Sequence, residues 1–294
     1  MRRAGRPGIL SMGCAQRLAH AIGRGRHQQS EQPADLGELL IRFSAVLMVC
    51  AAFLGALSAV AAGKCKIAKV VDLPITMNSL RPTIDVKINN RDAKFVLDSG
   101  AFYSMISSAT AAEYNLKTAP GYGLRVTGIG GTADVGVATV KEFSIVGLII
   151  KNVEFLVGGS EVGNAGLLGQ NLLEKFDVEY DLATGSIRLF KTEDCDHARL
   201  AYWLAPGQDF SWMPIERIEP MHPHTIGVAY VNDKKIRVEF DTGAFTSVLS
   251  LKAAERAGVR PDSPGVVASG YCRGIGRGMT KEYIAPFASF KIGD

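Results

Sequence analysis

The sequence predicts an all-β protein made of two related β-barrel lobes in tandem, each with a short helix. Apolar and polar residues alternate along several short segments, glycine-containing turns separate those segments, and one pattern of this kind occurs twice. With 47% hydrophobic and 21% charged residues, the composition is that of a globular protein, which excludes wholesale disorder. The 32 glycines follow no three-residue period, which excludes collagen.

The repeated pattern begins with a β-hairpin. Residues 82–98 read PTIDVKINNRDAKFVLD, in which two alternating stretches flank the polar pair Asn89-Asn90. Residues 224–241 read HTIGVAYVNDKKIRVEFD and repeat this arrangement around Asn232-Asp233. Both segments therefore predict a hairpin with a tight polar turn.

A shift of 143 residues superposes the two copies. It places Asp98 on Asp241 and the segment DSGAFYSMIS on DTGAFTSVLS. A short helix is expected after each segment, because Ser107 and Ser250 are suited to cap a helix N-terminus. Gly258 is suited to end the second helix.

The first copy continues further than the second. A hairpin around the turn Ala183-Thr184-Gly185 closes the first copy, and nothing like GLLGQNLL at 166–173 follows in the second, which we expect to be incomplete. The remaining expected elements are a glycine-rich tip at 128–131 and strands at 137–145 and 152–158 in the first copy, and a tip at 274–278 and strands near 284–292 in the second.

Four regions follow from this reading. The connection between the copies has weak periodicity and holds both tryptophans, and we interpret it as packed against the copies; an exposed aromatic interaction surface is the alternative. The regions are an N-terminal extension at 1–63, a first lobe at 64–192, a connection at 193–220 and an incomplete second lobe at 221–294.

The N-terminal extension contains an uncharged hydrophobic segment at 43–63. Small residues at 58–62 suit signal-peptidase cleavage near Ala61–Gly63, which predicts export to the periplasm or beyond. The alternative is an uncleaved anchor in the inner membrane, since about 20 apolar residues span a bilayer. Membrane contact is expected through this segment alone.

Charge and cysteine content narrow the function classes. Residues 1–42 carry seven arginines and three acidic residues, which accounts for the whole net charge of +4. The predicted lobes are therefore neutral, and no nucleic-acid partner is expected. Beyond the hydrophobic segment lie Cys65, Cys195 and Cys272, so one disulfide can form in an oxidising compartment, and its pairing stays open.

The two copies of Asp-Ser/Thr-Gly predict chemistry. One such tripeptide is an ordinary turn signal, but each copy here ends an apolar strand and precedes Ala-Phe-x-Ser. Two carboxylates that share a proton can activate water for peptide hydrolysis, because their mutual repulsion separates their pKa values. One aspartate from each lobe, Asp98 and Asp241, would meet on a local twofold axis.

At these residues the sequence resembles the aspartic proteases, in particular the retropepsin-like group with its D-[ST]-G-A-x-x-S motif. The hydrophobic segment together with the tandem copies is similar to exported bacterial members. The resemblance implies a catalytic dyad of Asp98 and Asp241, loops shaped by Ser99, Gly100, Thr242 and Gly243, a supporting segment with Leu167, Leu168 and Gly169, and a flap at Gly128, Ile129, Gly130 and Gly131.

The resemblance implies an aspartic endopeptidase acting on polypeptides without a cofactor or metal. Retroviral members form their site by homodimerisation, so a monomeric pseudo-dimer and a homodimer are both open. A catalytically inactive peptide-binding or scaffolding protein in the periplasm is the alternative function. Phe102 and Phe245 are expected to pack the lobes together. Zinc binding at His222 and His224, with Cys195 and His197 upstream, is disfavoured because the spacing matches no closed zinc motif.

Overall fold

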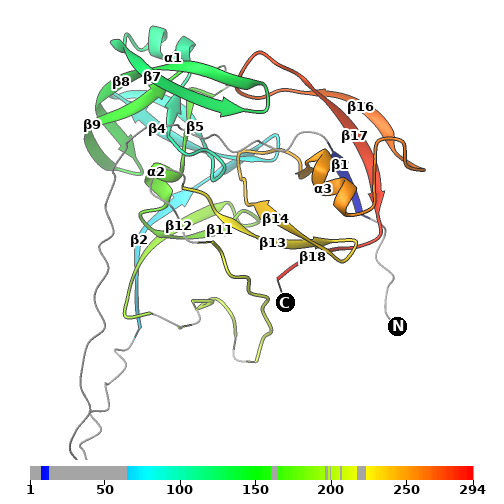
Figure 1. The fold of residues 1–294 in the computed structure, drawn as a ribbon. Helices are drawn as coiled ribbons and strands as arrows, with labels where there is room; N and C mark the ends of the chain where they lie inside the picture. The colour runs from blue at the N-terminus through cyan, green and yellow to red at the C-terminus, as the bar shows by residue number, and fades with distance from the viewer. Residues whose placement is uncertain are drawn as a thin grey trace, which may run out of the picture.

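The computed structural model describes residues 8–12 and 65–293, apart from 160–163, 196–197, 199, 206 and 217–222. In these residues strands predominate, and the helices are short (Figure 1). The predicted all-β class is therefore confirmed.

The first lobe carries most of the strands. Its elements are β2 (Lys66–Pro74), β3 (Thr76–Asn78), β4 (Arg81–Ile88), β5 (Arg91–Leu97), β6 (Met105–Ile106), α1 (Ser108–Glu113), β7 (Thr118–Gly128), β8 (Gly131–Ile145), β9 (Leu148–Val157), β10 (Gly166–Leu168), α2 (Gln170–Leu173), β11 (Asp177–Asp181) and β12 (Ser186–Glu193).

The second lobe repeats the beginning of this series. Its elements are β13 (Ile226–Val231), β14 (Lys234–Glu239), β15 (Val248–Leu249), α3 (Leu251–Arg256), β16 (Val267–Cys272), β17 (Thr280–Phe287) and β18 (Phe290–Ile292), and β1 (Gly8–Met12) lies beside β17 (Figure 1).

The main sheet of the first lobe closes into a barrel. Its strand order is β3-β4-β5-β10-β6-β9-β8-β7, and a further pairing between β4 and β8 joins the two sides. The interior contains Phe95, Phe143 and Phe155, whose ring centroids lie 5.2–5.8 Å apart. Burial of these three rings stabilises the barrel that supports the first Asp-Ser-Gly loop.

The second lobe is built from two smaller sheets, with strand orders β14-β13-β18 and β15-β1-β17-β16. Val231, Ile236, Ala254, Ala285 and Phe287 are buried between them. Within the described residues, this lobe has no counterpart of β10 and α2, in agreement with the expected incomplete repeat.

Local signals in the sequence account for the turns and helix ends. Asn89-Asn90 and Asn232-Asp233 both have positive φ at each position, as a two-residue type I′ hairpin turn requires. The Ser107 and Ser250 side chains accept hydrogen bonds from backbone N–H groups in the first turns of α1 and α3. Gly258, at φ +84°, follows the end of α3. These expectations are confirmed.

The connection between the lobes differs in part from the expectation. The Tyr202 ring packs edge-on against Phe190 of the first lobe, with ring centroids 5.4 Å apart. The side chains of Trp203 and Trp212, however, are 60% and 62% exposed. The prediction of a packed connection therefore holds for Tyr202 and is wrong for most of the surface of both indoles.

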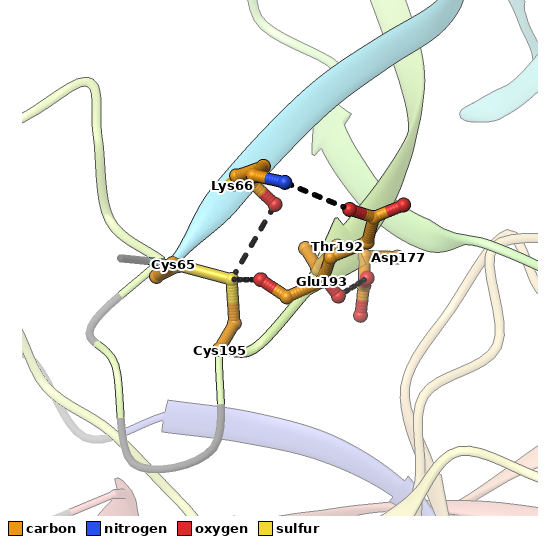
Figure 2. Close-up of a disulfide and its surroundings, with 6 residues drawn as sticks. All are labelled: Cys65, Lys66, Asp177, Thr192, Glu193 and Cys195. Atoms are coloured by element: carbon orange, nitrogen blue, oxygen red, sulfur yellow. Dashed lines mark hydrogen bonds and ion pairs between the residues drawn. A yellow bond between two sulfur atoms is a disulfide. The ribbon is translucent and has the colours of Figure 1, made fainter. Parts of the chain in front are cut away.

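A disulfide joins Cys65 to Cys195 (Figure 2). It lies where β2 begins and β12 has just ended, next to the antiparallel pair Lys66 and Glu193, which form an ion pair. The sequence left the pairing open because proximity of these strand ends follows from the sheet register. No helix among the described residues is long and apolar enough to cross a membrane, and the segment 43–63 lies outside those residues.

The disulfide should contribute strongly to stability, because it closes a loop with a sequence separation of 130 residues. We expect Cys195→Ser to lower the free energy of unfolding by about 2–5 kcal/mol, mainly by releasing the unfolded chain. Chemical denaturation of both proteins measures the difference. Reducing agent should lower the stability of the wild type to that of the variant; a variant as stable as the oxidised wild type would contradict the assignment.

Candidate active site

The two Asp-Ser/Thr-Gly loops meet between the lobes. Asp98 follows the last residue of β5, and Asp241 lies two residues beyond β14, so each loop leaves a strand of its own hairpin. Backbone and side-chain contacts between the loops bring them together, although 143 residues separate them in sequence. The structure therefore places both predicted aspartates in one site.

Reciprocal hydrogen bonds fix the two loops to each other. The Ser99 backbone N–H donates to Oγ1 of Thr242, and the Thr242 backbone N–H donates to Oγ of Ser99, both at 3.0 Å. Each hydroxyl also donates across the interface, Ser99 to the Phe240 carbonyl at 2.6 Å and Thr242 to the Leu97 carbonyl at 2.7 Å. These four bonds form a near-symmetric set, as a local twofold axis requires.

The carboxylates are held by their own loops. In each lobe, Oδ1 of the aspartate accepts hydrogen bonds from two backbone N–H groups, which fixes the orientation of the side chain. The donors are Gly100 at 2.9 Å and Ala101 at 3.0 Å for Asp98, and Gly243 at 2.8 Å and Ala244 at 3.0 Å for Asp241.

Both glycines are required by close approach. A Cβ atom at Gly100 would lie 2.6 Å from both carboxylate oxygens of Asp241. A Cβ atom at Gly243 would lie 2.5 Å from Oδ1 of Asp98. Each aspartate therefore lies over the glycine of the opposite loop, and any side chain there would push the two carboxylates apart.

The electrostatics of the site differ from those of an exposed carboxylate. Burial raises the pKa of Asp98 well above its ordinary value, and the charge of Asp241 and a side-chain hydrogen bond with it add to the increase. The N–H groups of Gly100 and Ala101 oppose it. Asp98 is thus suited to keep a proton at a pH where an exposed aspartate has lost it.

Tyr180, on β11, also faces this site. Burial raises its pKa to about 12, the nearby charge of Asp98 adds to the increase, and a hydrogen bond with Ser99 opposes it. Sequence reasoning missed Tyr180, since it lies in a strand of the hairpin that closes the first copy and carries no motif.

The segment with Leu167, Leu168 and Gly169 lies directly beneath the first loop. The Leu168 carbonyl accepts a hydrogen bond from the Asp98 backbone N–H at 2.9 Å. Leu167 and Leu168 are buried, and a Cβ at Gly169 would lie 2.7 Å from the Ala101 carbonyl oxygen. This segment therefore sets the height of the Asp98 loop.

Gln170 extends this support to the second lobe. Its buried amide Nε2 donates to the Ser99 carbonyl at 2.9 Å and to Oγ1 of Thr225 at 3.0 Å. Sequence reasoning missed Gln170, although its place directly after the GLLG segment was a usable signal.

Support for the two loops is unequal. Phe102 packs edge-on against His224 of the second lobe, with ring centroids 4.0 Å apart. Phe245, its counterpart, is 62% exposed. The expectation that both phenylalanines pack the lobes together is therefore correct for Phe102 and wrong for Phe245, because the described part of the second lobe has no segment like β10 and α2 to cover it.

The two glycine-rich tips touch each other. Gly128, Ile129, Gly130 and Gly131 form the tip of the β7–β8 hairpin, as predicted from the sequence. Gly130 forms a parallel bridge with Gly276 of the second lobe, and its carbonyl accepts a hydrogen bond from the Gly278 N–H at 2.7 Å. A Cβ at Gly130 would lie 2.8 Å from the Ile275 carbonyl oxygen. Small residues thus allow the tips to meet.

The disfavoured zinc ligands do not come together in the described structure. His224 is buried, and its Nδ1 lies 2.7 Å from Glu239. His222 and His197 lie outside the described residues. Within the part of the chain that the structure describes, no group of three potential ligands is close enough to hold a metal ion.

Comparison with known families agrees with this geometry. Residues 84–172 and 228–294 match the family model described as "Aspartyl protease". This chain belongs to the aspartyl protease family. The two matched ranges contain the two Asp-Ser/Thr-Gly loops, one in each lobe, and no curated protein sequence matches the chain.

Solved structures of aspartic proteases are similar to single lobes or parts of this aspartyl protease. A retropepsin-like aspartic protease from Rickettsia conorii is 22% identical, covers 44% of this chain and 94% of its own, and has a TM-score of 0.31. EIAV protease complexed with the inhibitor HBY-793 is 26% identical, with coverage of 32% and 86% and a TM-score of 0.28. The retroviral protease-like domain of Ddi1 from Leishmania major is 18% identical, with coverage of 41% and 90% and a TM-score of 0.28.

The raised pKa of Asp98 predicts a pH-dependent stability. The folded protein keeps a proton that the unfolded chain releases near 3.8, so this stabilisation is complete below 3.8 and is lost as the pH rises through the folded pKa. Asp98→Asn stays neutral throughout. Its Tm should therefore match that of the wild type at pH 3 and exceed it increasingly toward neutral pH, as calorimetry would measure.

Asp85→Asn is the control, because the Asp85 carboxylate is 83% exposed and pairs only with Lys94 at the surface. Its Tm difference from the wild type should stay small over the same range. A Tm difference between Asp98→Asn and the wild type that does not grow with pH would contradict the assigned environment of Asp98.

Proposed function

We propose that this aspartyl protease is an endopeptidase in which Asp98 and Asp241 together activate a water molecule. The observation that supports this best is the approach of each carboxylate to the glycine of the opposite loop. The reciprocal Ser99 and Thr242 hydrogen bonds supply the rigidity that such a pair needs.

The raised pKa of Asp98 assigns the roles. Asp98 holds the shared proton and donates it to the oxygen of the scissile carbonyl, while Asp241 removes a proton from water. The water oxygen then bonds to the carbonyl carbon and gives a tetrahedral diol. Transfer of a proton to the amide nitrogen lets the carbon–nitrogen bond break, which releases an amine and a carboxylic acid.

The substrate is a polypeptide, as membership of the family implies. The paired glycine tips support a role in covering it, because both hairpins reach the interface between the lobes. Both aspartates come from one chain, which favours a monomeric pseudo-dimer over a homodimer.

The alternative is a catalytically inactive, peptide-binding member of the family. Its support is the unequal backing of the two loops: Leu168 bonds to the backbone of Asp98, whereas Phe245 in the second loop is largely exposed. A weakly supported Asp241 would keep the fold and lose the alignment that catalysis requires.

We further propose that the protein is exported, with the segment 43–63 as a signal peptide. The Cys65–Cys195 disulfide supports this location, because disulfides persist in oxidising compartments and are rare in the cytosol. An uncleaved anchor would place the same residues outside the cytoplasm.

Activity should require both aspartates. Asp98→Asn and Asp241→Asn should each lower peptide cleavage at least about 10³-fold, because one carboxylate cannot serve as acid and base in the same step. Cleavage of a peptide library, read by mass spectrometry, measures this, and the pH profile should be bell-shaped.

The control is Asp85→Asn, which removes an exposed carboxylate and should keep full activity. Metal chelators should have no effect. A folded wild type without activity on the library at any pH would favour the peptide-binding alternative, and a chelator-sensitive activity that survives both Asn variants would contradict the dyad.

Processing should remove the N-terminal extension. In a Gram-negative host, the full chain should be recovered outside the cytoplasm with a new N-terminus near Ala61–Gly63, because small residues precede that position. N-terminal sequencing of the recovered protein measures this. An intact chain extracted from the membrane would instead establish the anchor, and a soluble intact chain in the cytoplasm would contradict export.

A further inference from the structure

β1 is the one described element that the internal repeat does not explain. It comprises Gly8–Met12, far from the second lobe in sequence, yet it is an inner strand of the sheet β15-β1-β17-β16 (Figure 1). It pairs parallel with β15 and antiparallel with β17. The first lobe shows which strand normally takes this place.

In the first lobe, β9 lies between β6 and β8 and runs parallel to one and antiparallel to the other. The shift of 143 residues relates β6 to β15. In the same way, β8 corresponds to β17 and β18: Phe143 pairs with Ile88, and Phe290 pairs with Val231, the counterpart of Ile88. β1 therefore has the neighbours and directions of β9.

The register agrees residue by residue. In the first lobe, Leu156 pairs with Met105 on one side and Val137 on the other. In the second lobe, Ser11 pairs with Val248 and Ile284, which are the counterparts of those two residues.

The next pair repeats the match. Val157 pairs with Ile106 and Gly136, and Met12 pairs with Leu249 and Tyr283. A strand register is set within one residue, since a slip of one position reverses every side chain. Agreement on both edges therefore defines a single slot with a fixed register.

The slot belongs to the core of the second lobe. Leu249, Ala285 and Phe287 lie on the strands that flank β1 and are buried in that core. Without an inner strand, β15 and β17 would each expose unpaired backbone N–H and C=O groups, which proteins avoid.

We propose that the space between β15 and β17 is a strand-acceptor site, filled in cis by the N-terminal strand Gly8–Met12, which replaces the counterpart of β9. The site takes an extended segment of five residues through backbone hydrogen bonds. This proposal does not depend on catalysis.

The position of β1 in the sequence gives the site a consequence. β1 precedes the hydrophobic segment 43–63, whereas β15 and β17 follow it. Cleavage near Ala61–Gly63 would remove β1 and open the site, and insertion of the segment in a membrane would separate β1 from it. The second lobe is thus complete in a chain that keeps its N-terminus on the same side.

Cysteine cross-linking in the full chain tests the register. Ser11→Cys with Ile284→Cys should form a disulfide under mild oxidation, because these residues are direct partners. The matched control is Ser11→Cys with Glu282→Cys, two positions along β17 on the same face. Mass spectrometry of peptides should find the first cross-link at least about tenfold more often; equal yields would contradict the register.

Backbone exchange gives an independent test in the same full chain. Leu10→Pro removes an N–H from the middle of β1, so amide exchange in β15 and β17 should accelerate at least about tenfold. Exchange in β6 and β8 should stay unchanged, as should all exchange in the control Gln29→Pro. Unchanged exchange in β15 and β17 of Leu10→Pro would overturn the proposal, whatever the activity of the protein.

Discussion

The reciprocal hydrogen bonds between Ser99 and Thr242 determine how the two lobes meet. Each hydroxyl accepts a backbone N–H from the opposite loop and donates to a carbonyl of the opposite lobe, so all of its capacity is used across the interface. The positions of both aspartates follow from this, since each lies within two residues of a bonded group. Loss of either hydroxyl would leave buried polar groups of the other lobe without a partner.

The duplicated loops are almost identical, but their surroundings are unequal. The first loop is supported from below by Leu168 and joined to the second lobe by Gln170, whereas the exposed Phe245 shows how much less covers the second loop. An interface with nearly twofold geometry thus joins a well-supported lobe to a weakly supported one. The order of the second loop depends chiefly on its contacts with the first.

Much of the fold was predictable because its signals are local. Asn89-Asn90 and Ser107 determine a turn and a helix start within a few residues, and the repeat placed Asp98 and Asp241 in equivalent loops. Gln170, Tyr180 and the choice of Cys195 as the partner of Cys65 depend on distances between strands remote in sequence. β1 was missed for the same reason, because a repeat shows that a strand is lacking and not which segment replaces it.

The Cys65–Cys195 disulfide makes the first lobe a covalent ring. Every strand from β2 to β12 lies inside this ring, and the second lobe leaves it through a single stretch of chain after Cys195. A cut of the backbone at one point within the ring would leave both fragments attached, so the barrel around Asp98 would remain one molecule. A cut in the connection after Cys195 would instead separate the two aspartates into different molecules, held together only by non-covalent contacts.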